Sequence, residues 1–235
     1  MRTHWDKHAG AWDGHLPNSD LFAELLAIVL DRAGPDPDQV AADLGAGNGF
    51  LTLPLLDRCR TVIAVDNSAT MLEKLRERAG DNPRLSIAPV TFLEFEPTEP
   101  LDIVVSNFAL HHLRHPAKHA LLGRCFAQLR PGGRIVVSDI MVALTLRPGR
   151  SGPLWAKVAK IAKKGPAGFW RIGKNGVRWV IGTGEYPADP GFWTAALRSA
   201  GFTEVGHTAV GRETGVVWGF KPPTAYVSRE LVPPK

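Results

Sequence analysis

The sequence predicts an α/β protein with a doubly wound, mostly parallel seven-stranded sheet and a C-terminal antiparallel hairpin. Two observations lead to this prediction. Short β-branched or apolar runs alternate with helix-like segments between 39 and 138, and the runs 202–210 and 214–220 are separated by only three residues. Apolar strands separated by helices are typical of a parallel sheet covered on both faces. A very short link between two strands favours a hairpin.

The individual elements follow from periodicity and turn signals. Strands are expected at 39–44, 60–65, 84–89, 101–106 and 133–138, before the final hairpin. Helical patterns cover about 18–33, 50–58, 67–79, 117–130 and 188–200. The turn-forming sequences RAGPDPD (32–38), AGDNP (79–83) and RPGG (130–133) close three of these helices.

Length and composition favour one domain with insertions. A chain of 235 residues with 44% hydrophobic content can bury one sizeable core. No apolar stretch approaches the roughly 18 residues of a membrane span, and the first residues are charged and rich in histidine, so we expect a cytoplasmic protein. Cys59 and Cys125 lack CxxC spacing, which favours buried thiols over a disulfide or zinc site.

Positive charge is concentrated in one segment. Nine basic residues and no acidic one lie between Val142 and Gly184, which leaves −4 for the rest of a chain of net charge +5. Within 153–165 the lysines alternate with an apolar helical face. One hypothesis is that 153–181 docks on an anionic membrane surface or attracts a lipid-like acceptor; the alternatives are a solvated lid and nucleic-acid binding.

A glycine-rich turn follows the first expected parallel strand. The stretch ADLGAGNGF (42–50) lies where an open α/β sheet binds ligands. Gly45 and Gly47 would let the backbone pass beneath a ligand, free N–H groups would suit a polar group, and Gly49 would allow the helix to pack on the strand. A dinucleotide fingerprint would need glycine at Phe50, which disfavours a nicotinamide enzyme. Asp66, at the end of the second strand, could hold ribose hydroxyls.

Four motifs in order resemble those of the class I S-adenosylmethionine-dependent methyltransferases. They are VAADLGAGNGF, VIAVDNSATML (62–72), LDIVVSNFALHHL (101–113) and LRPGGRIVVSD (129–139). The subgroup resembled is the small-molecule enzymes similar to the ubiquinone and menaquinone methyltransferases. The resemblance implies S-adenosyl-L-methionine as cofactor and a small, largely apolar acceptor methylated at oxygen, nitrogen or carbon.

The resemblance also implies roles for individual residues. Asp43 would anchor the methionine amino group, Gly45, Ala46 and Gly47 would run beneath the methionine and ribose, and Gly49 completes the turn. Asp66 would hold the ribose hydroxyls, Asn67 and Met71 would lie against the adenine, and Asn107 would face the sulfonium. The acid that commonly meets the adenine amino group is missing after the third strand, where Thr91 or Val90 stands instead. Thr91 with Phe92 could still bind the adenine through a hydroxyl or backbone group and an apolar wall.

Histidines are the candidate general bases. His111 and His112 follow the fourth strand, where the resemblance places the acceptor, and a histidine pKa suits proton transfer near neutrality. A structural role for one of the pair is the alternative, and no metal ligands are expected. His4, His8 and His15 are weaker candidates in a segment that relatives tend to fold over the cofactor.

The sequence therefore divides into five parts. We expect N-terminal cap helices at 1–35, where Trp5 and Trp12 share one helical face, and a cofactor-binding core at 36–141. A basic insert follows at 142–187, as a lid or an acceptor-recognition element, and 188–221 completes the core before a tail at 222–235. A nucleic-acid methyltransferase is disfavoured because SNFA replaces the usual N/D-P-P-aromatic turn. A non-catalytic S-adenosylmethionine-binding protein remains the other alternative.

Overall fold

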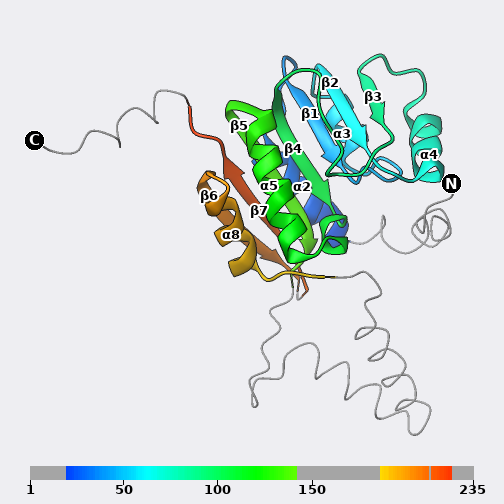
Figure 1. The fold of residues 1–235 in the computed structure, drawn as a ribbon. Helices are drawn as coiled ribbons and strands as arrows, with labels where there is room; N and C mark the ends of the chain where they lie inside the picture. Colours follow the sequence, from blue (N-terminus) through cyan, green and yellow to red (C-terminus); the bar gives the residue numbers. More distant parts are fainter. Residues whose placement is uncertain (1–19, 142–185, 212, 224–235) are drawn as a thin grey trace, which may run out of the picture.

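The computed structural model describes residues 20–141, 186–211 and 213–223. They form a seven-stranded sheet in the order β3-β2-β1-β4-β5-β7-β6 (Figure 1). The first five strands pair in parallel, and β7 pairs antiparallel with both β5 and β6. The predicted fold class is confirmed, including the C-terminal antiparallel pair.

The strands fall close to the positions that the apolar runs predict. They are β1 (Val40–Leu44), β2 (Thr61–Val65), β3 (Leu85–Ala88), β4 (Leu101–Asn107), β5 (Leu129–Ile140), β6 (Thr203–Val210) and β7 (Thr214–Phe220). The helices are α2 (Asp20–Ala33), α3 (Thr52–Leu56), α4 (Ala69–Ala79), α5 (His115–Gln128) and α8 (Pro190–Ser199), with the short 3-10 helix η2 (Leu110–His112). Ser68 and Asp189 cap α4 and α8 by accepting hydrogen bonds from backbone N–H groups of the first turn.

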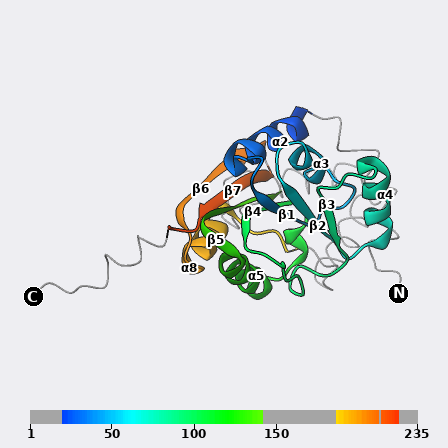
Figure 2. The same ribbon diagram turned by 90° about the horizontal axis from the view of Figure 1, so that it is seen from above.

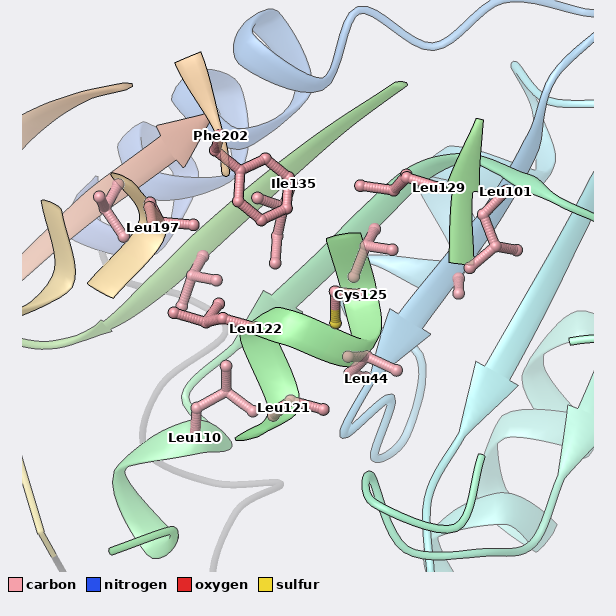
Figure 3. Close-up of a cluster of buried hydrophobic side chains, with 14 of the residues drawn as sticks. Leu44, Leu101, Leu110, Leu121, Leu122, Cys125, Leu129, Ile135, Leu197 and Phe202 are labelled. Carbon is pink, nitrogen blue, oxygen red and sulfur yellow. The ribbon is translucent and has the colours of Figure 1, made fainter. Parts of the chain in front are cut away.

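Helices cover both faces of the sheet (Figure 2). One layer, with α2 and α3, buries Leu25, Val29 and Leu55 against alternate side chains of the central strands. The other layer, with α5 and α8, buries a larger cluster that includes Leu121, Leu122, Cys125, Leu197 and Phe202 (Figure 3). Because helices cover both faces of the sheet, the side chains on both faces of β1 are buried along the whole strand.

The prediction that RPGG at 130–133 forms a turn before the fifth strand is wrong. The structure includes it in β5, where Leu101 pairs with Leu129 and Ile103 pairs with Arg134. The extra residues on β5 therefore form an irregularity within the ladder, with Gly132 at φ +82°. The physical reason is that Leu129 is itself buried in the core and begins the strand pairing before the bulge.

Several predictions lie outside the described residues. They concern His4, His8, His15, Trp5, Trp12 and most of the basic insert. Within the ranges that the structure describes, no helix is both long and apolar enough to cross a membrane, and no cluster of three or more potential metal-ligating side chains occurs.

Candidate functional site

A cavity of about 300 Å³ opens at the carboxyl ends of the parallel strands. Its lining comes from the segments that follow β1, β2, β3 and β4, together with Phe22 of α2. Open α/β sheets bind ligands at this edge, where the strand order reverses between β1 and β4. The volume is at the lower end of the range typical of small-molecule sites.

The glycine turn forms the floor of the cavity, but its backbone is used differently from the prediction. The N–H groups of Gly45 and Ala46 donate to Val65 O, at 2.8 and 3.1 Å, and Gly47 N donates to Asp66 Oδ2 at 2.9 Å. Gly49 N donates to Ala46 O. The prediction that the turn offers free N–H groups is therefore wrong for these four residues, because the fold itself uses them as donors.

The three glycines of the turn differ in what a side chain at each position would contact. A Cβ on Gly45 would lie 2.2 Å from Ala109 Cβ, so the turn passes tightly against the segment after β4. A Cβ on Gly49 would lie 2.4 Å from Leu75 Cδ1, which shows that Gly49 allows close packing on α4 rather than lining the cavity. Gly47 differs, since a Cβ there would meet no atom within 4 Å. Its φ of +53° still favours glycine.

Asp66 follows β2 and is held by the backbone around it. Its Oδ2 accepts from Gly47 N at 2.9 Å and its Oδ1 accepts from Ser68 N at 2.8 Å. A carboxylate has about four acceptor sites, so these bonds are compatible with further donors from a ligand. The arrangement fixes the carboxylate beside the glycine turn, at the cavity wall.

Asp43 is the second carboxylate of the cavity. It lies at the end of β1, is only 1% exposed and accepts a hydrogen bond from Thr52 Oγ1 at 2.7 Å. Burial raises the pKa of Asp43 from 3.8 to about 7; the Thr52 hydrogen bond opposes this change, and the nearby Asp66 carboxylate adds to it. A cationic ligand group beside Asp43 would therefore stabilise the ionised carboxylate and lower its raised pKa.

The segment after β3 provides one end of the cavity. Thr91 and Phe92 line it together with Asn67, which precedes α4, and Met71, in the first turn of α4. Thr91 Oγ1 donates to Glu94 Oε2 at 2.7 Å, and Thr91 N donates to the same oxygen at 3.2 Å. These bonds lower the pKa of the exposed Glu94 carboxyl. Glu94 was not predicted, although the T-x-x-E pattern of a capping box marks it in the sequence.

The two adjacent histidines have different environments. His112 lines the cavity, whereas His111 is buried, with its Nδ1 2.6 Å from Asp139 Oδ1. The two rings lie 3.9 Å apart between centroids. The backbone of His111 accepts a hydrogen bond from Tyr186 N, so the chain at 186 lies beside this turn.

Aromatic residues that the sequence analysis did not single out as site residues form another wall. Phe22 stacks on Phe108 with centroids 5.4 Å apart and meets the edge of Phe50 at 5.2 Å. All three line the cavity. Phe108 has a φ of +47°, which is uncommon for a residue other than glycine. Its N–H donates to Ser138 O, which holds this backbone against β5.

Most predicted site residues meet in this one cavity. The lining includes Asp43, Gly45, Ala46, Gly47, Asp66, Asn67, Met71, Thr91, Phe92, Asn107 and His112. Gly49 and His111 do not line it, because Gly49 packs on α4 and His111 turns toward Asp139. Among the described lining residues there is no lysine or arginine.

Comparisons with known proteins agree with this geometry. Residues 41–133 match the family model described as a methyltransferase domain. The chain is 38% identical over 124 residues to an uncharacterized methyltransferase of Geobacillus thermodenitrificans (strain NG80-2), covering 51% of this chain and 55% of the relative. It is 36% identical over 135 residues to a carboxy-S-adenosyl-L-methionine synthase of Pseudomonas putida (strain GB-1), covering 53% and 54%. The chain thus spans about half the length of these curated relatives.

Solved structures share the fold at low sequence identity. The structure of the DhpI–SAH complex has a TM-score of 0.66 at 20% identity and covers 93% of this chain and 94% of that one. Human N-acetylserotonin methyltransferase in complex with SAM has a TM-score of 0.63 at 17% identity, covering 93% and 55%. The fold is that of the class I methyltransferases. The part of the chain that resembles the methyltransferase-domain model begins within β1 and includes the glycine turn, Asp66 and the two histidines.

Proposed function

We propose that this chain is a methyltransferase that binds S-adenosyl-L-methionine in the cavity and methylates a small, largely apolar acceptor. The observation that carries the proposal is the charge of the cavity. Two carboxylates, Asp43 and Asp66, line it, and none of its described lining residues is a lysine or arginine. Such a cavity favours a ligand with positive groups, such as a sulfonium and an ammonium, and disfavours a dinucleotide diphosphate.

The residues present fit this cofactor. Asp66 presents carboxylate oxygens suited to the paired hydroxyls of a ribose, and Gly47 leaves its side of the turn open. Asp43 lies one strand away from Asp66 and offers a buried carboxylate to an ammonium group. When bound, the cofactor supplies a methyl group that is already activated as part of a sulfonium. The protein is then left to orient the acceptor and to exclude water.

The acceptor is assigned to the aromatic end of the cavity. Phe22 and Phe108 form an apolar wall near Asn107 and His112, at the end of β4. A base is needed only where the attacking atom carries a proton of high pKa. His112 is the histidine that lines the cavity, so we assign it this task and assign the buried His111 to holding the turn against Asp139.

The cofactor assignment is tested by titration calorimetry with S-adenosyl-L-methionine, S-adenosyl-L-homocysteine and NAD. We expect the two S-adenosyl ligands to bind and NAD to give no specific heat. Asp66→Ala should weaken S-adenosyl binding by at least tenfold, because a hydrogen bond to a charged group contributes about 1.5–3 kcal/mol. Asp81→Ala is the matched control, since Asp81 is exposed and does not line the cavity. Unchanged binding by Asp66→Ala would refute the ribose assignment.

The base assignment is tested with methyl transfer to a phenolic or hydroxyl acceptor found by screening. His112→Gln should lower kcat by about 100-fold while the melting temperature stays near that of the wild type. His111→Gln should lower the melting temperature instead, because the buried Asp139 carboxylate loses its partner. His207→Gln, at an exposed position on β6, is the control. Full turnover by His112→Gln would exclude this base, and cofactor binding without turnover on any acceptor would favour a non-catalytic role.

A further inference from the structure

Lys118 is a buried lysine that lies outside the cavity. It belongs to the first turn of α5, and its exposed fraction is 0%. Its ammonium donates hydrogen bonds to Leu113 O and to Tyr186 O, the latter at 2.6 Å, and lies 5.8 Å from the centroid of the Trp193 ring. Neither cofactor binding nor the base assignment uses this buried charge.

The charge of Lys118 needs an explanation, because burying an ammonium is costly unless it is paired. Desolvation lowers the pKa of Lys118 from 10.5 to about 8, and the negative charge of Asp139, itself buried on β5, opposes this change. Lys118 is therefore mostly protonated at neutral pH. A methionine at this position would fill similar space without the cost of a buried charge. The specific contribution of Lys118 is thus the pair of bonds that it makes to two backbone segments.

Lys118 and His111 together hold the backbone of Tyr186. Tyr186 N donates to His111 O, and Tyr186 O accepts from Lys118. Asp139 holds the His111 end from β5, since its Oδ1 lies 2.6 Å from His111 Nδ1. The chain that leads into α8 is therefore joined by hydrogen bonds to the turn before α5, in addition to the apolar packing of the two helices on one face of the sheet (Figure 1).

The same turn forms part of the acceptor end of the cavity. His112 ends η2 and Leu113 follows it, and both line the cavity. Leu113 O is one of the two carbonyl groups that Lys118 binds, whereas Lys118 itself does not line the cavity. The two carboxylates assigned to the cofactor, Asp43 and Asp66, lie at the ends of other strands. A displacement of the turn would therefore alter the acceptor end and leave these carboxylates in place.

We propose that Lys118 is a positioning residue for methyl transfer, which acts through Leu113 and Tyr186 to hold the acceptor end of the cavity in place. It acts on the acceptor only through other residues. This inference rests on the proposed function, since it takes the cavity to be the site of a methyl transfer. It extends that function by naming a buried charge behind the cavity on which the placement of His112 depends.

The experiment compares Lys118→Met with the wild type at a temperature well below both melting temperatures. Titration calorimetry with S-adenosyl-L-homocysteine measures the cofactor end, where Kd should change by less than about twofold. Initial rates of methyl transfer to the phenolic or hydroxyl acceptor found by screening, at saturating S-adenosyl-L-methionine, measure the acceptor end. There kcat/KM for the acceptor should fall by about tenfold or more, because a small misplacement of reacting groups has a large effect on rate.

Lys221→Met is the matched control. Lys221 also donates to carbonyl oxygens, those of Phe126 and Leu129 at the C-terminal end of α5, and it does not line the cavity. Its replacement should lower the melting temperature, as that of Lys118 does, without changing kcat/KM. A merely structural role of Lys118 would give both variants this same result.

Tyr186→Pro breaks the same link from the other side. It removes the N–H that donates to His111 O, and it leaves Tyr186 O available to Lys118, so that no buried charge loses its partner. We expect a lower kcat/KM with an unchanged Kd for S-adenosyl-L-homocysteine, as in Lys118→Met. This variant provides the test if Lys118→Met does not fold.

The outcomes separate this inference from the function on which it rests. Full kcat/KM in either variant that folds overturns the positioning role and leaves the methyl-transfer assignment intact. An equal loss of cofactor affinity, or the failure of both variants to fold, also overturns it, because the link would then serve the whole domain. A wild type that binds no S-adenosyl-L-homocysteine or methylates no acceptor refutes the proposed function itself. A lower kcat/KM with retained cofactor affinity, together with normal turnover by Lys221→Met, supports the inference.

Discussion

The affinity for S-adenosyl-L-homocysteine should depend on the ionisation of Asp43. Because burial raises the pKa of Asp43 to about 7, the ionised fraction of the free protein falls from about 76% at pH 7.5 to about 3% at pH 5.5. If only the ionised form binds the ligand ammonium, the Kd rises about 25-fold across this interval. Binding at the lower pH should also release close to one proton from Asp43.

Titration calorimetry in buffers of different ionisation enthalpy measures both the affinity and the proton release. Asp43→Asn should bind more weakly and lose the proton release that is due to this carboxyl. His112 also lines the cavity, so His112→Gln is the companion variant that removes any contribution of its charge. Affinity that stays constant between about pH 5.5 and 7.5 in the wild type would refute the role of Asp43.

The same raised pKa has a consequence for the protein without ligand. The folded-state pKa of Asp43 lies above the unfolded value of 3.8, so the folded protein binds more protons between these two values. The contribution of Asp43 to the free energy of unfolding therefore decreases as pH rises from about 4 to 7, by an amount on the order of 4 kcal/mol. Thermal melts of the wild type and of Asp43→Asn over this range measure the difference.

Two further predictions follow from packing. Gly49→Ala should destabilise the fold by about 1–3 kcal/mol, because its Cβ would lie 2.4 Å from Leu75 Cδ1 at a φ of +94°. Gly47→Ala has open space around its Cβ, so it should lower the free energy of unfolding by no more than about 1 kcal/mol and should weaken cofactor binding instead. Equal melting temperatures for Gly49→Ala and Gly47→Ala would contradict this prediction. Lys118→Met should lower the free energy of unfolding by about 2 kcal/mol, because the buried ammonium donates hydrogen bonds to the carbonyl oxygens of Leu113 and Tyr186. An unchanged denaturation midpoint for this variant would contradict the prediction.

The fold was largely predictable because its strands are buried on both faces and read as apolar runs. Boundaries were less predictable where pairing, rather than composition, determines them. β5 begins at Leu129 because this residue pairs with Leu101, although a turn-forming RPGG sequence follows it immediately. The start of α5 at His115 similarly precedes the apolar pattern, with a proline in its first turn.

The candidate site was predictable to the extent that it follows the ends of strands. Asp43 lies near the end of β1 and Asp66 follows the neighbouring parallel strand β2, so their approach in space follows from topology alone. The adjacent His111 and His112 could not be separated in this way, because only the 3-10 turn decides which ring meets Asp139 and which meets the cavity. The aromatic wall at Phe108 depends on side-chain contacts between segments that no local pattern specifies. The carboxylate of Glu94 beside Thr91 could have been predicted, because the T-x-x-E pattern is local.

A crystal structure of the complex with S-adenosyl-L-homocysteine tests the central claim most directly. We expect the adenine beside Thr91 and Phe92, the ribose hydroxyls on Asp66 and the amino group on Asp43. The sulfur should then face Asn107 at the end where His112 and Phe108 lie. Electron density for the ligand outside this cavity, or inside it with the ribose away from Asp66, would contradict the account.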